Sequence, residues 1–428
     1  MLTKIKKALQ ECGIAEYMIK EETREGLELY FIRRTLDIRR QTRVQTWGVT
    51  VYRTFEEKET KYRGFASVVI SDGMLQDEIC ERIRTAYESA ACVKNLWYPL
   101  PGKETSDGVE DRHPELSGRL KEQAMAAAEA VFSVDPQEDA FINSLEVFAR
   151  MTQTRIVNSE GTDVSWRAYQ VDGEFVAQCR EPQDVETWQD FSYEQLDKAA
   201  LADKAAEILQ QTRDRARASA APKAGAYRLI LSDSNAEIVL RYFAERSCAE
   251  MIYPGYSSWR AGDDVQMMGS DAPVTGDRLN ITLAVSEPYS SEGIRMKDRP
   301  LLENGVLKTI YGGARCCSYL STEPTGSYTR LMVQPGTVSL EEMRQKPYLY
   351  VVSFSDFQMD SFTGSFAGEI RLGYLYDGKT VNLVTGGSVN GQITEAQKQM
   401  ILSKERQKTM TFDGPKAICM EDVTVAGQ

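Results

Sequence analysis

Hydrophobic and polar residues alternate over several short segments in the chain up to about residue 95. Leu27, Leu29 and Phe31 recur at every second position, an incomplete form of the pattern of a half-buried strand. Strands are predicted over three segments: residues 26–34, 46–55 and 62–70. The spacing then changes, and four large side chains fall on one face of a predicted helix: Leu75, Ile79, Ile83 and Tyr87. Residues 1–97 are therefore predicted to form an N-terminal α/β domain, a sheet with covering helices.

Residues 98–221 form the predicted middle segment. It begins with a loop rich in proline, glycine and charge, and a helical pattern follows over residues 116–131. Two alternating runs then flank turn residues at 158–161, which predicts a hairpin: residues 142–156 and 164–179. A capping-box pattern at residues 192–195 predicts the start of a helix that ends in a linker.

Beyond residue 222 the pattern changes to short β-branched and aromatic runs interrupted by glycines. A strand is predicted over residues 227–231 and a helix from 235 to about 251. Many short strands separated by turns predict a largely antiparallel sheet or partial barrel over residues 222–428. The predicted fold class is α+β, with a C-terminal β-rich domain after the N-terminal sheet.

The composition is that of a globular protein with two or three domains. The chain has 428 residues, of which 42% are hydrophobic and 27% charged, and it is too long for one ordinary core. It has no run of about eighteen apolar residues to cross a bilayer, and its first ten residues lack the apolar centre of a secretory signal. We therefore expect a cytoplasmic protein with no membrane partner.

The net charge opposes binding to nucleic acid. Sixty-three acidic and fifty-one basic residues give a formal net charge of −12, which repels a phosphate backbone unless a basic stripe overrides it. The strongest stripe comprises Arg213, Arg215, Arg217 and Lys223. It continues a predicted helix and is interpreted as a solvated helix end, where cations are favoured by the helix dipole. We expect no direct nucleic-acid partner.

Histidine is scarce, and this limits the available chemistry. His113 is the single histidine, whereas most zinc, iron and copper sites and most nucleophilic sites draw on imidazoles. It precedes a proline and is interpreted as a solvated loop residue. The eight cysteines contain no CxxC pair, which is typical of free thiols in a reducing compartment. The adjacent Cys316 and Cys317 are interpreted as buried packing residues.

Several stretches, in the same order along the chain, match motifs of one known family. The most specific is Pro-Tyr-Ser-Ser-Glu-Gly-Ile-Arg at residues 288–295, followed by Asn-Gly-Val-Leu-Lys-Thr at 304–309. Further matches lie at four places: residues 63–67, 154–161, 360–366 and 423–427. The chain thereby resembles the TldD/PmbA family, whose members are described as modulators of DNA gyrase and as peptidase family U62. The resemblance covers almost the whole chain.

The family has two branches that differ in their metal ligands. Members of the TldD branch carry an H-E-x-x-x-H helix whose histidines, with a C-terminal cysteine, hold zinc while the glutamate acts as the base. The matching positions here are Ala236, Glu237 and Arg241, so both histidine positions are lost and Glu237 is a remnant of the base position. Cys419 lies in an alternating strand that already accounts for it. The resemblance implies the metal-free TldE/PmbA branch, with no cofactor and no confident catalytic residue.

For that branch the resemblance implies a subunit that pairs with a TldD-like chain, or with itself, in a complex that degrades or processes peptides. Candidate residues for a peptide cavity lie in two segments: Ser290, Ser291, Glu292 and Arg295 in one, and Tyr256 and Trp259 in the other. The two aromatic residues are alternatively explained by packing. Whether the assembly is a homodimer or a heterodimer, and which peptide it processes, stays open.

Two other functions remain as alternatives. A stand-alone hydrolase without metal would use Ser290 or Ser291 with Glu292, or Asp356 and Asp360 as paired carboxylates. The Ser-Ser-Glu-Gly stretch is more simply a turn. A non-enzymatic modulator of DNA gyrase is the other alternative, and nothing in the sequence identifies that partner.

Overall fold

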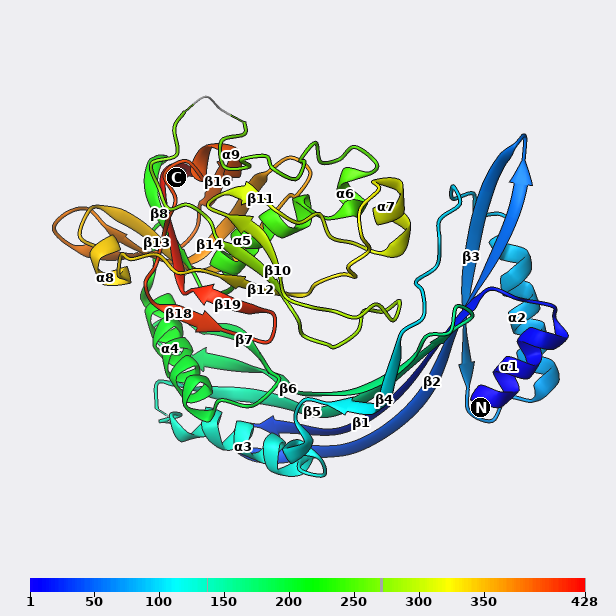
Figure 1. Cartoon of the computed structure of the whole chain (residues 1–428). Helices are drawn as coiled ribbons and strands as arrows, with labels where there is room; N and C mark the ends of the chain where they lie inside the picture. The colour runs from blue at the N-terminus through cyan, green and yellow to red at the C-terminus, as the bar shows by residue number, and fades with distance from the viewer. Residues whose placement is uncertain (137, 270–271, 428) are drawn as a thin grey trace.

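A long curved sheet forms the N-terminal half of the protein (Figure 1). The computed structural model describes residues 1–136, 138–269 and 272–427. The strand order is β3-β2-β1-β5-β6-β4, and β7 pairs with β6. These strands are β1 (Tyr17–Ile32), β2 (Thr35–Glu57), β3 (Thr60–Ser71), β4 (Thr105–Asp111), β5 (Ala140–Asn158), β6 (Asp163–Cys179) and β7 (Val185–Tyr193). All neighbours are antiparallel except β4 and β6.

Apolar side chains alternate with polar ones along the strands, so the sheet has an apolar face. Helices cover this face at two places. At one end α1 (Leu2–Glu11) and α2 (Gln76–Ala90) bury Ile5, Ile79 and Ile83 against Trp47 and Val49. Nearer the other end, α3 (Leu120–Ser133) and α4 (Lys198–Arg217) cover a second apolar area that lines the same sheet: Leu27, Leu29, Val147, Val171 and Phe175. The short helix η1 (Pro114–Leu116) precedes α3.

The sheet crosses the predicted boundary at residue 97, since β1 pairs with β2 on one side and with β5 on the other. The predicted hairpin around residues 158–161 is confirmed by the antiparallel pairing of β5 with β6. The predicted start of a helix at residues 192–195 is wrong. Tyr193 still pairs with Val171 in the sheet, and α4 begins after Asp197, whose side chain accepts the backbone N–H of Ala200 at 3.0 Å.

The C-terminal half contains two further sheets, which confirms the predicted β-rich domain. One has the order β13-β8-β20-β16-β14-β15, with β17 on β20, and the pairing of β13 with β14 closes it into a barrel. Its strands are β8 (Gly225–Ser232), β13 (Tyr348–Met359), β14 (Ser365–Tyr376), β15 (Val381–Val384), β16 (Ser388–Gln392), β17 (Ile401–Leu402) and β20 (Ala417–Ala426). Closure satisfies the backbone of strands that would otherwise lie at an edge.

The other sheet has the order β11-β10-β9-β12-β19-β18. Its strands are β9 (Ile281–Ala284), β10 (Arg299–Glu303), β11 (Val306–Leu307), β12 (Arg330–Val333), β18 (Arg406–Lys408) and β19 (Phe412–Pro415). The helices of this half are α5 (Ser234–Arg246), α6 (Ala249–Ile252), α7 (Ala314–Tyr319), α8 (Leu340–Met343) and α9 (Ile393–Ala396). Among them α5 buries Val239, Leu240 and Phe243 completely in a core shared by both sheets.

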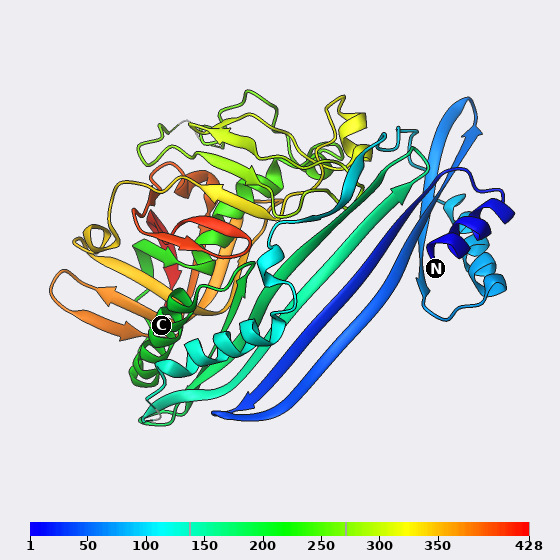
Figure 2. The same ribbon diagram turned by 60° about the horizontal axis from the view of Figure 1, so that its bottom comes forward.

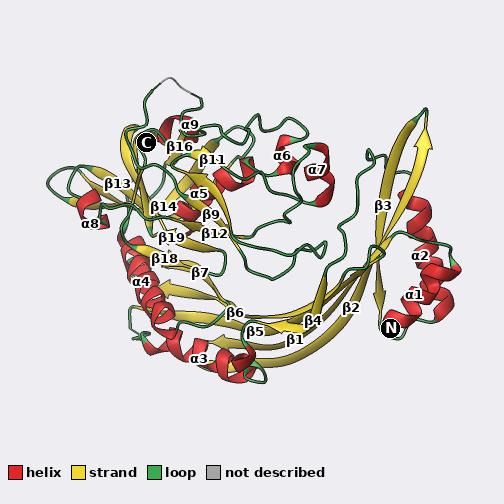
Figure 3. Ribbon diagram, viewed as in Figure 1, coloured by secondary structure: helices red, strands yellow, loops and turns green. Residues whose placement is uncertain are grey.

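The C-terminal domain lies over one face of the long sheet, whereas α1 and α2 lie at the far end of the long strands (Figures 1 and 2). Figure 3 shows α3 on the opposite side of the sheet from the C-terminal strands. Tyr289 of the C-terminal domain packs on Trp166 of β6, with ring centroids 5.7 Å apart. In the described part of the chain, no helix is both long and apolar enough to cross a membrane.

A glycine on β3 tests how tightly the N-terminal helices pack on the sheet. A Cβ atom on Gly64 would lie 1.8 Å from the carbonyl oxygen of Ala90 and 2.5 Å from that of Val93. Gly64→Ala is therefore expected to lower the free energy of unfolding by about 2 kcal/mol or more, measured by thermal melting. Gly102→Ala is the control, because a Cβ atom there meets open space. Equal melting temperatures for the two variants would contradict this packing.

Candidate functional site

Helix α5 carries the positions that match the zinc-binding motif. It follows β8 through Asp233, which has a φ of 55° and a ψ of −130°. Ala236 is completely buried in the core beneath the helix, so a ligand at this position would have to displace core side chains. Glu237 and Arg241 lie one turn apart, with side chains 14% and 26% exposed.

Glu237 and Arg241 form an ion pair that also contacts Thr329 and Thr411, the residues just before β12 and β19. Arg241 Nη2 lies 2.5 Å from Glu237 Oε1, which also accepts a hydrogen bond from the hydroxyl of Thr411 at 3.0 Å. The guanidinium donates further hydrogen bonds to the backbone carbonyls of Thr329 at 3.0 Å and Thr411 at 3.2 Å. The carboxylate at the base position is therefore neutralised by the residue at a ligand position.

This ion pair separates two hollows. One has a volume of about 550 Å³ and lies between α4, β7, α5 and the β18–β19 hairpin. The other has a volume of about 370 Å³ and is bordered by Tyr311 and Tyr328. Glu237, Arg241 and Thr411 line both of them. The pair thus forms a partition between the hollows.

Two lysines of the larger hollow pair with carboxylates that line it. Lys204 Nζ lies 3.2 Å from Asp233 Oδ1, and Lys416 Nζ lies 3.2 Å from Glu207 Oε2. Burial alone would lower the pKa of Lys416, but the carboxylates of Asp233 and Glu207 outweigh burial and raise that pKa above its ordinary value. Lys416 therefore stays a cation and is held in an ion pair.

Cys419 does not face α5. It is buried on β20 among residues of the opposite face of the barrel sheet, including Tyr350, whereas its neighbours Ile418 and Met420 belong to the core that contains α5. Successive side chains of a strand point to opposite faces, which explains this division. Burial raises the pKa of the Cys419 thiol to about 11, so the thiolate that zinc requires is disfavoured.

The residues around α5 do not fit a zinc ion. A cation, Arg241, stands where the family has a histidine, and Ala236 has no donor atom. Structural and catalytic zinc sites need at least three protein ligands. Over residues 1–136, 138–269 and 272–427, no group of three or more His, Cys, Asp or Glu side chains is placed to hold a metal ion.

The Ser-Ser-Glu-Gly loop forms a tight turn. Ser290 is 7% exposed, and its hydroxyl accepts hydrogen bonds from the backbone N–H groups of Glu292 and Ile294, both at 3.2 Å. Ser291 is exposed. Glu292 accepts the backbone N–H of Ala314 at 2.9 Å. Burial raises the pKa of the Glu292 carboxyl, an effect that this hydrogen bond reduces without cancelling.

Arg295 joins the same loop to the long sheet. Its Nη1 atom lies 2.6 Å and 2.7 Å from the two carboxylate oxygens of Glu110 on β4, and the Tyr289 hydroxyl donates to the same carboxylate at 2.5 Å. Burial raises the pKa of the Glu110 carboxyl, but the hydrogen bonds from Tyr289 and Arg295 and the charge of Arg295 together outweigh burial and lower that pKa. The loop is thus a contact between the two halves of the chain.

The two aromatic candidates occupy different environments. Trp259 is 5% exposed and packs on Tyr242 and Phe243, with centroid distances of 5.8 Å and 6.3 Å. Tyr256 is 56% exposed and lies edge-on to Phe362 at 5.1 Å. Neither they nor the candidates of the Ser-Ser-Glu-Gly loop line the two hollows beside Glu237, so their role in a peptide cavity stays a prediction.

The carboxylates of Asp356 and Asp360 are each engaged locally. Asp360 accepts the backbone N–H of Phe362 at 2.8 Å and the hydroxyl of Thr363 at 2.7 Å, and the hydroxyl and backbone hydrogen bonds lower its pKa. Asp356 accepts the side-chain amide of Gln358 at 2.9 Å. Both carboxylates are held by local hydrogen bonds, and their role as a catalytic pair stays a prediction.

His113 is less exposed than the sequence suggested. Its side chain is 22% exposed, with Nδ1 3.2 Å from Glu115 and Nε2 3.3 Å from Glu194. The expectation of a solvated histidine is corrected to a half-buried one, because β7 leads directly into the segment that carries Glu194. It does lie in the predicted loop, immediately before η1.

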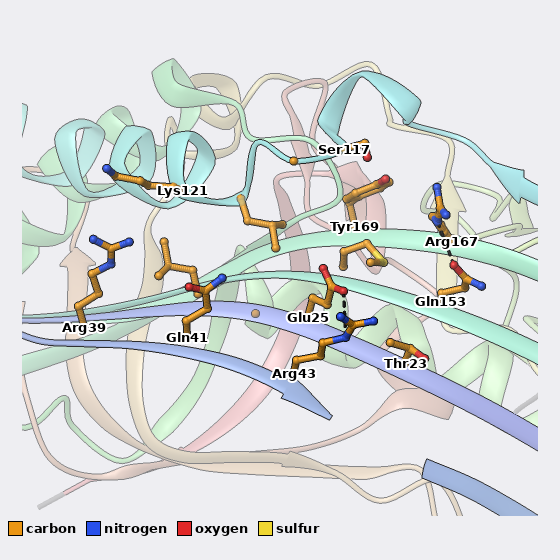
Figure 4. Close-up of a pocket in the computed structure, with 15 residues that line it drawn as sticks. Thr23, Glu25, Arg39, Gln41, Arg43, Ser117, Lys121, Gln153, Arg167 and Tyr169 are labelled. Atoms are coloured by element: carbon orange, nitrogen blue, oxygen red, sulfur yellow. Dashed lines mark hydrogen bonds and ion pairs between the residues drawn. The ribbon is translucent and has the colours of Figure 1, made fainter. Parts of the chain in front are cut away.

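Sequence reasoning missed a basic pocket on the long sheet. It has a volume of about 580 Å³ and is lined by residues of β1, β2, β5, β6 and the start of α3. Figure 4 shows Arg39, Gln41 and Arg43 following one another along β2, with Lys121 across the pocket. Residues 35–45 are rich in charge, and no strand was predicted there. The signal that would have found the pocket is the recurrence of long polar side chains at every second position, Arg39, Gln41 and Arg43.

Comparisons with known proteins agree with this architecture. Two family models match: the PmbA/TldA metallopeptidase central domain over residues 112–213 and the PmbA/TldA metallopeptidase C-terminal domain over residues 224–427. No curated protein sequence matched the chain.

Three solved structures share the fold over nearly the whole chain. TldE from Thermococcus kodakarensis is 15% identical with a TM-score of 0.76, and the alignment covers 99% of this chain and 100% of that one. A proposed modulator of DNA gyrase from Thermotoga maritima is 17% identical, with a TM-score of 0.74 and 99% of both chains covered. Another from Bacteroides thetaiotaomicron is 14% identical, with a TM-score of 0.75 and coverage of 100% and 99%.

The closed barrel, the long sheet and the helix at the motif position define a protein of the metallopeptidase-related PmbA/TldA class. The chain belongs to the TldD/PmbA family.

Removal of the arginine tests the structural role of the ion pair. Arg241→Met leaves the Glu237 carboxylate with little solvent and no cation, so we expect the free energy of unfolding to fall by about 1–3 kcal/mol. Glu237→Gln added to Arg241→Met is expected to restore part of this loss, because no unpaired charge remains. Urea unfolding of the two single variants and the double variant measures the coupling. Additive effects of the two substitutions would contradict the pairing.

Proposed function

We propose that this chain is a non-catalytic subunit of a TldD/TldE-type metalloprotease complex that degrades or processes peptides. The observation that carries the proposal is the ion pair between Glu237 and Arg241 on α5. A zinc protease uses its glutamate to accept a proton from a metal-activated water. Here the carboxylate at that position accepts hydrogen bonds from a guanidinium and a hydroxyl.

Each position of the metal motif supports a role without metal. Ala236 is buried in the core, Arg241 brings a positive charge that repels a metal cation, and Cys419 faces the other side of the barrel sheet. Restoration of a zinc site would therefore need changes on two faces of this sheet. We infer that catalysis belongs to a partner, a TldD-like chain with an intact H-E-x-x-x-H motif, and that this chain supplies interface and part of the peptide cavity.

The likeness to TldE from Thermococcus kodakarensis is consistent with this subunit role. A homodimer is the alternative assembly, and peptides are the proposed substrate in either case. We place the complex in the cytoplasm, because Cys12, Cys80, Cys92, Cys179, Cys248, Cys316, Cys317 and Cys419 are free thiols, as is typical of a reducing compartment. In this proposal, four residues of the Ser-Ser-Glu-Gly loop and its continuation contact the peptide: Ser290, Ser291, Glu292 and Arg295.

Metal analysis and peptidase assays test the proposal. We expect the purified chain to contain much less than one zinc ion per molecule and to leave unfolded polypeptides intact. Addition of a TldD-like chain should produce hydrolysis that a chelator abolishes. Glu237→Gln should change the rate of the pair by less than about twofold, because the carboxylate touches no reacting atom. The matched control is the same substitution at the motif glutamate of the TldD-like chain, which should abolish hydrolysis.

Three outcomes would overturn this assignment. Stoichiometric zinc in the isolated chain would contradict the loss of the metal site. Chelator-insensitive hydrolysis by the chain alone would favour a stand-alone hydrolase. Copurification with gyrase and no peptidase subunit would favour the gyrase modulator.

A further inference from the structure

The long sheet has an open edge along β2. The C-terminal part of β2 pairs with β1 and β3, but Thr35–Gln45 pairs with β1 on one side and with no strand of the described chain on the other. Every residue from 35 to 45 except Thr42 is exposed. A strand in this state presents a row of free backbone N–H and C=O groups to solvent. Such an edge is a template for one more strand.

The edge is strongly basic in a chain whose net charge is −12. Arg39, Arg40 and Arg43 lie within five residues of β2. Arg40 points to one face, where it pairs with Glu28 at 2.5 Å. Arg39 and Arg43, two pleats apart, lie on the other face. A positive stripe on an acidic protein marks a local preference for anionic ligands.

The face with Arg39 and Arg43 opens into the basic pocket of Figure 4. Lys121 lines the same pocket from α3, and neither Arg39 nor Lys121 has an ion pair or hydrogen bond within the residues that the structure describes. Arg43 forms one ion pair, in which its Nε atom lies 3.4 Å from Glu25 Oε1, and both side chains are exposed. Side chains of an added strand that point to this face would reach these cations.

The charge decides which strand fits the edge. Pairing with the same edge of a second copy, for example about Gln41, would place Arg39 opposite Arg43 twice, and like charges directly opposite each other are destabilising. Charged residues on an edge also protect proteins against self-association through that edge. An acidic strand has neither problem, because its carboxylates would meet Arg39, Arg43 and Lys121.

We infer that the open edge of β2 at Thr35–Gln45 binds an extended acidic segment of another polypeptide as an added strand. Backbone hydrogen bonds to the edge supply affinity, and carboxylates at alternate positions, directed toward Arg39, Arg43 and Lys121, supply selectivity. The site lies on the N-terminal sheet and is independent of the proposed role in proteolysis.

Fluorescence anisotropy with the full-length chain tests this inference. The probe is a labelled nine-residue peptide that alternates glutamate with threonine, and its counterpart has lysine in place of glutamate. We expect the acidic peptide to bind more tightly, and more so at low ionic strength. The double variant Arg39→Glu/Arg43→Glu should weaken binding by about tenfold or more, because two charge-assisted contacts become repulsive. The control is Arg82→Glu/Arg84→Glu, which makes the same charge change on α2 and should bind like the wild type.

Two N-methylated forms of the acidic peptide separate strand addition from simple charge attraction. One is methylated at the glutamates and the other at the threonines, so that their charge is equal. An added strand points the N–H groups of alternate residues at the edge, and one isomer should therefore lose binding at least tenfold more than the other.

Equal binding of the two N-methylated isomers would overturn the inference, as would equal binding of the acidic and basic peptides. Wild-type affinity in the Arg39→Glu/Arg43→Glu variant would do the same. Sedimentation of the protein without peptide identifies the alternative occupant: a dimer that this variant dissociates, with no peptide bound, would make the edge a contact between copies and reject the acidic strand.

Discussion

The structure depends on the position of β1 between β2 and β5. Its backbone is paired on both sides over nearly its whole length, from Met18 to Ile32. This register assigns every side chain of the long sheet to a face, and a slip of one residue would exchange the faces. Leu27 and Val147 thus lie under α3 and α4, whereas Trp166 on the other face meets Tyr289 of the C-terminal domain. The register of β1 with its two neighbours therefore determines which face α3 and α4 cover and which face the C-terminal domain covers.

Within the C-terminal domain, Arg241 connects elements that local structure does not join. It extends from α5 to the carbonyls of Thr329 and Thr411, which immediately precede the paired strands β12 and β19. The guanidinium offers five N–H donors in a fixed plane, so it binds both carbonyls and the Glu237 carboxylate at once.

Local sequence patterns predicted the positions of strands better than they predicted which strands pair with each other. The hairpin of β5 and β6 and the β-rich C-terminal domain follow from alternation and turn residues. The pairing of β1 with β5 joins segments more than one hundred residues apart, and such contacts leave no local signal. The resemblance located Glu237 and Arg241, yet the role of Thr411 arises only in three dimensions. Residues 35–45 were not predicted as a strand because charge obscured their alternation.

Central strands of the C-terminal barrel have no free edge, whereas the long sheet has one along part of β2. This free edge is the surface that can pair with a strand of a partner. The C-terminal barrel closes through β13 and β14, which removes the edges of its central strands. The long sheet stays open along Thr35–Gln45. Water satisfies these backbone groups in the free protein, and another strand can replace it at small cost because both states are fully hydrogen-bonded. Selectivity at such an edge must then come from side chains, and here it comes from arginines that favour carboxylates.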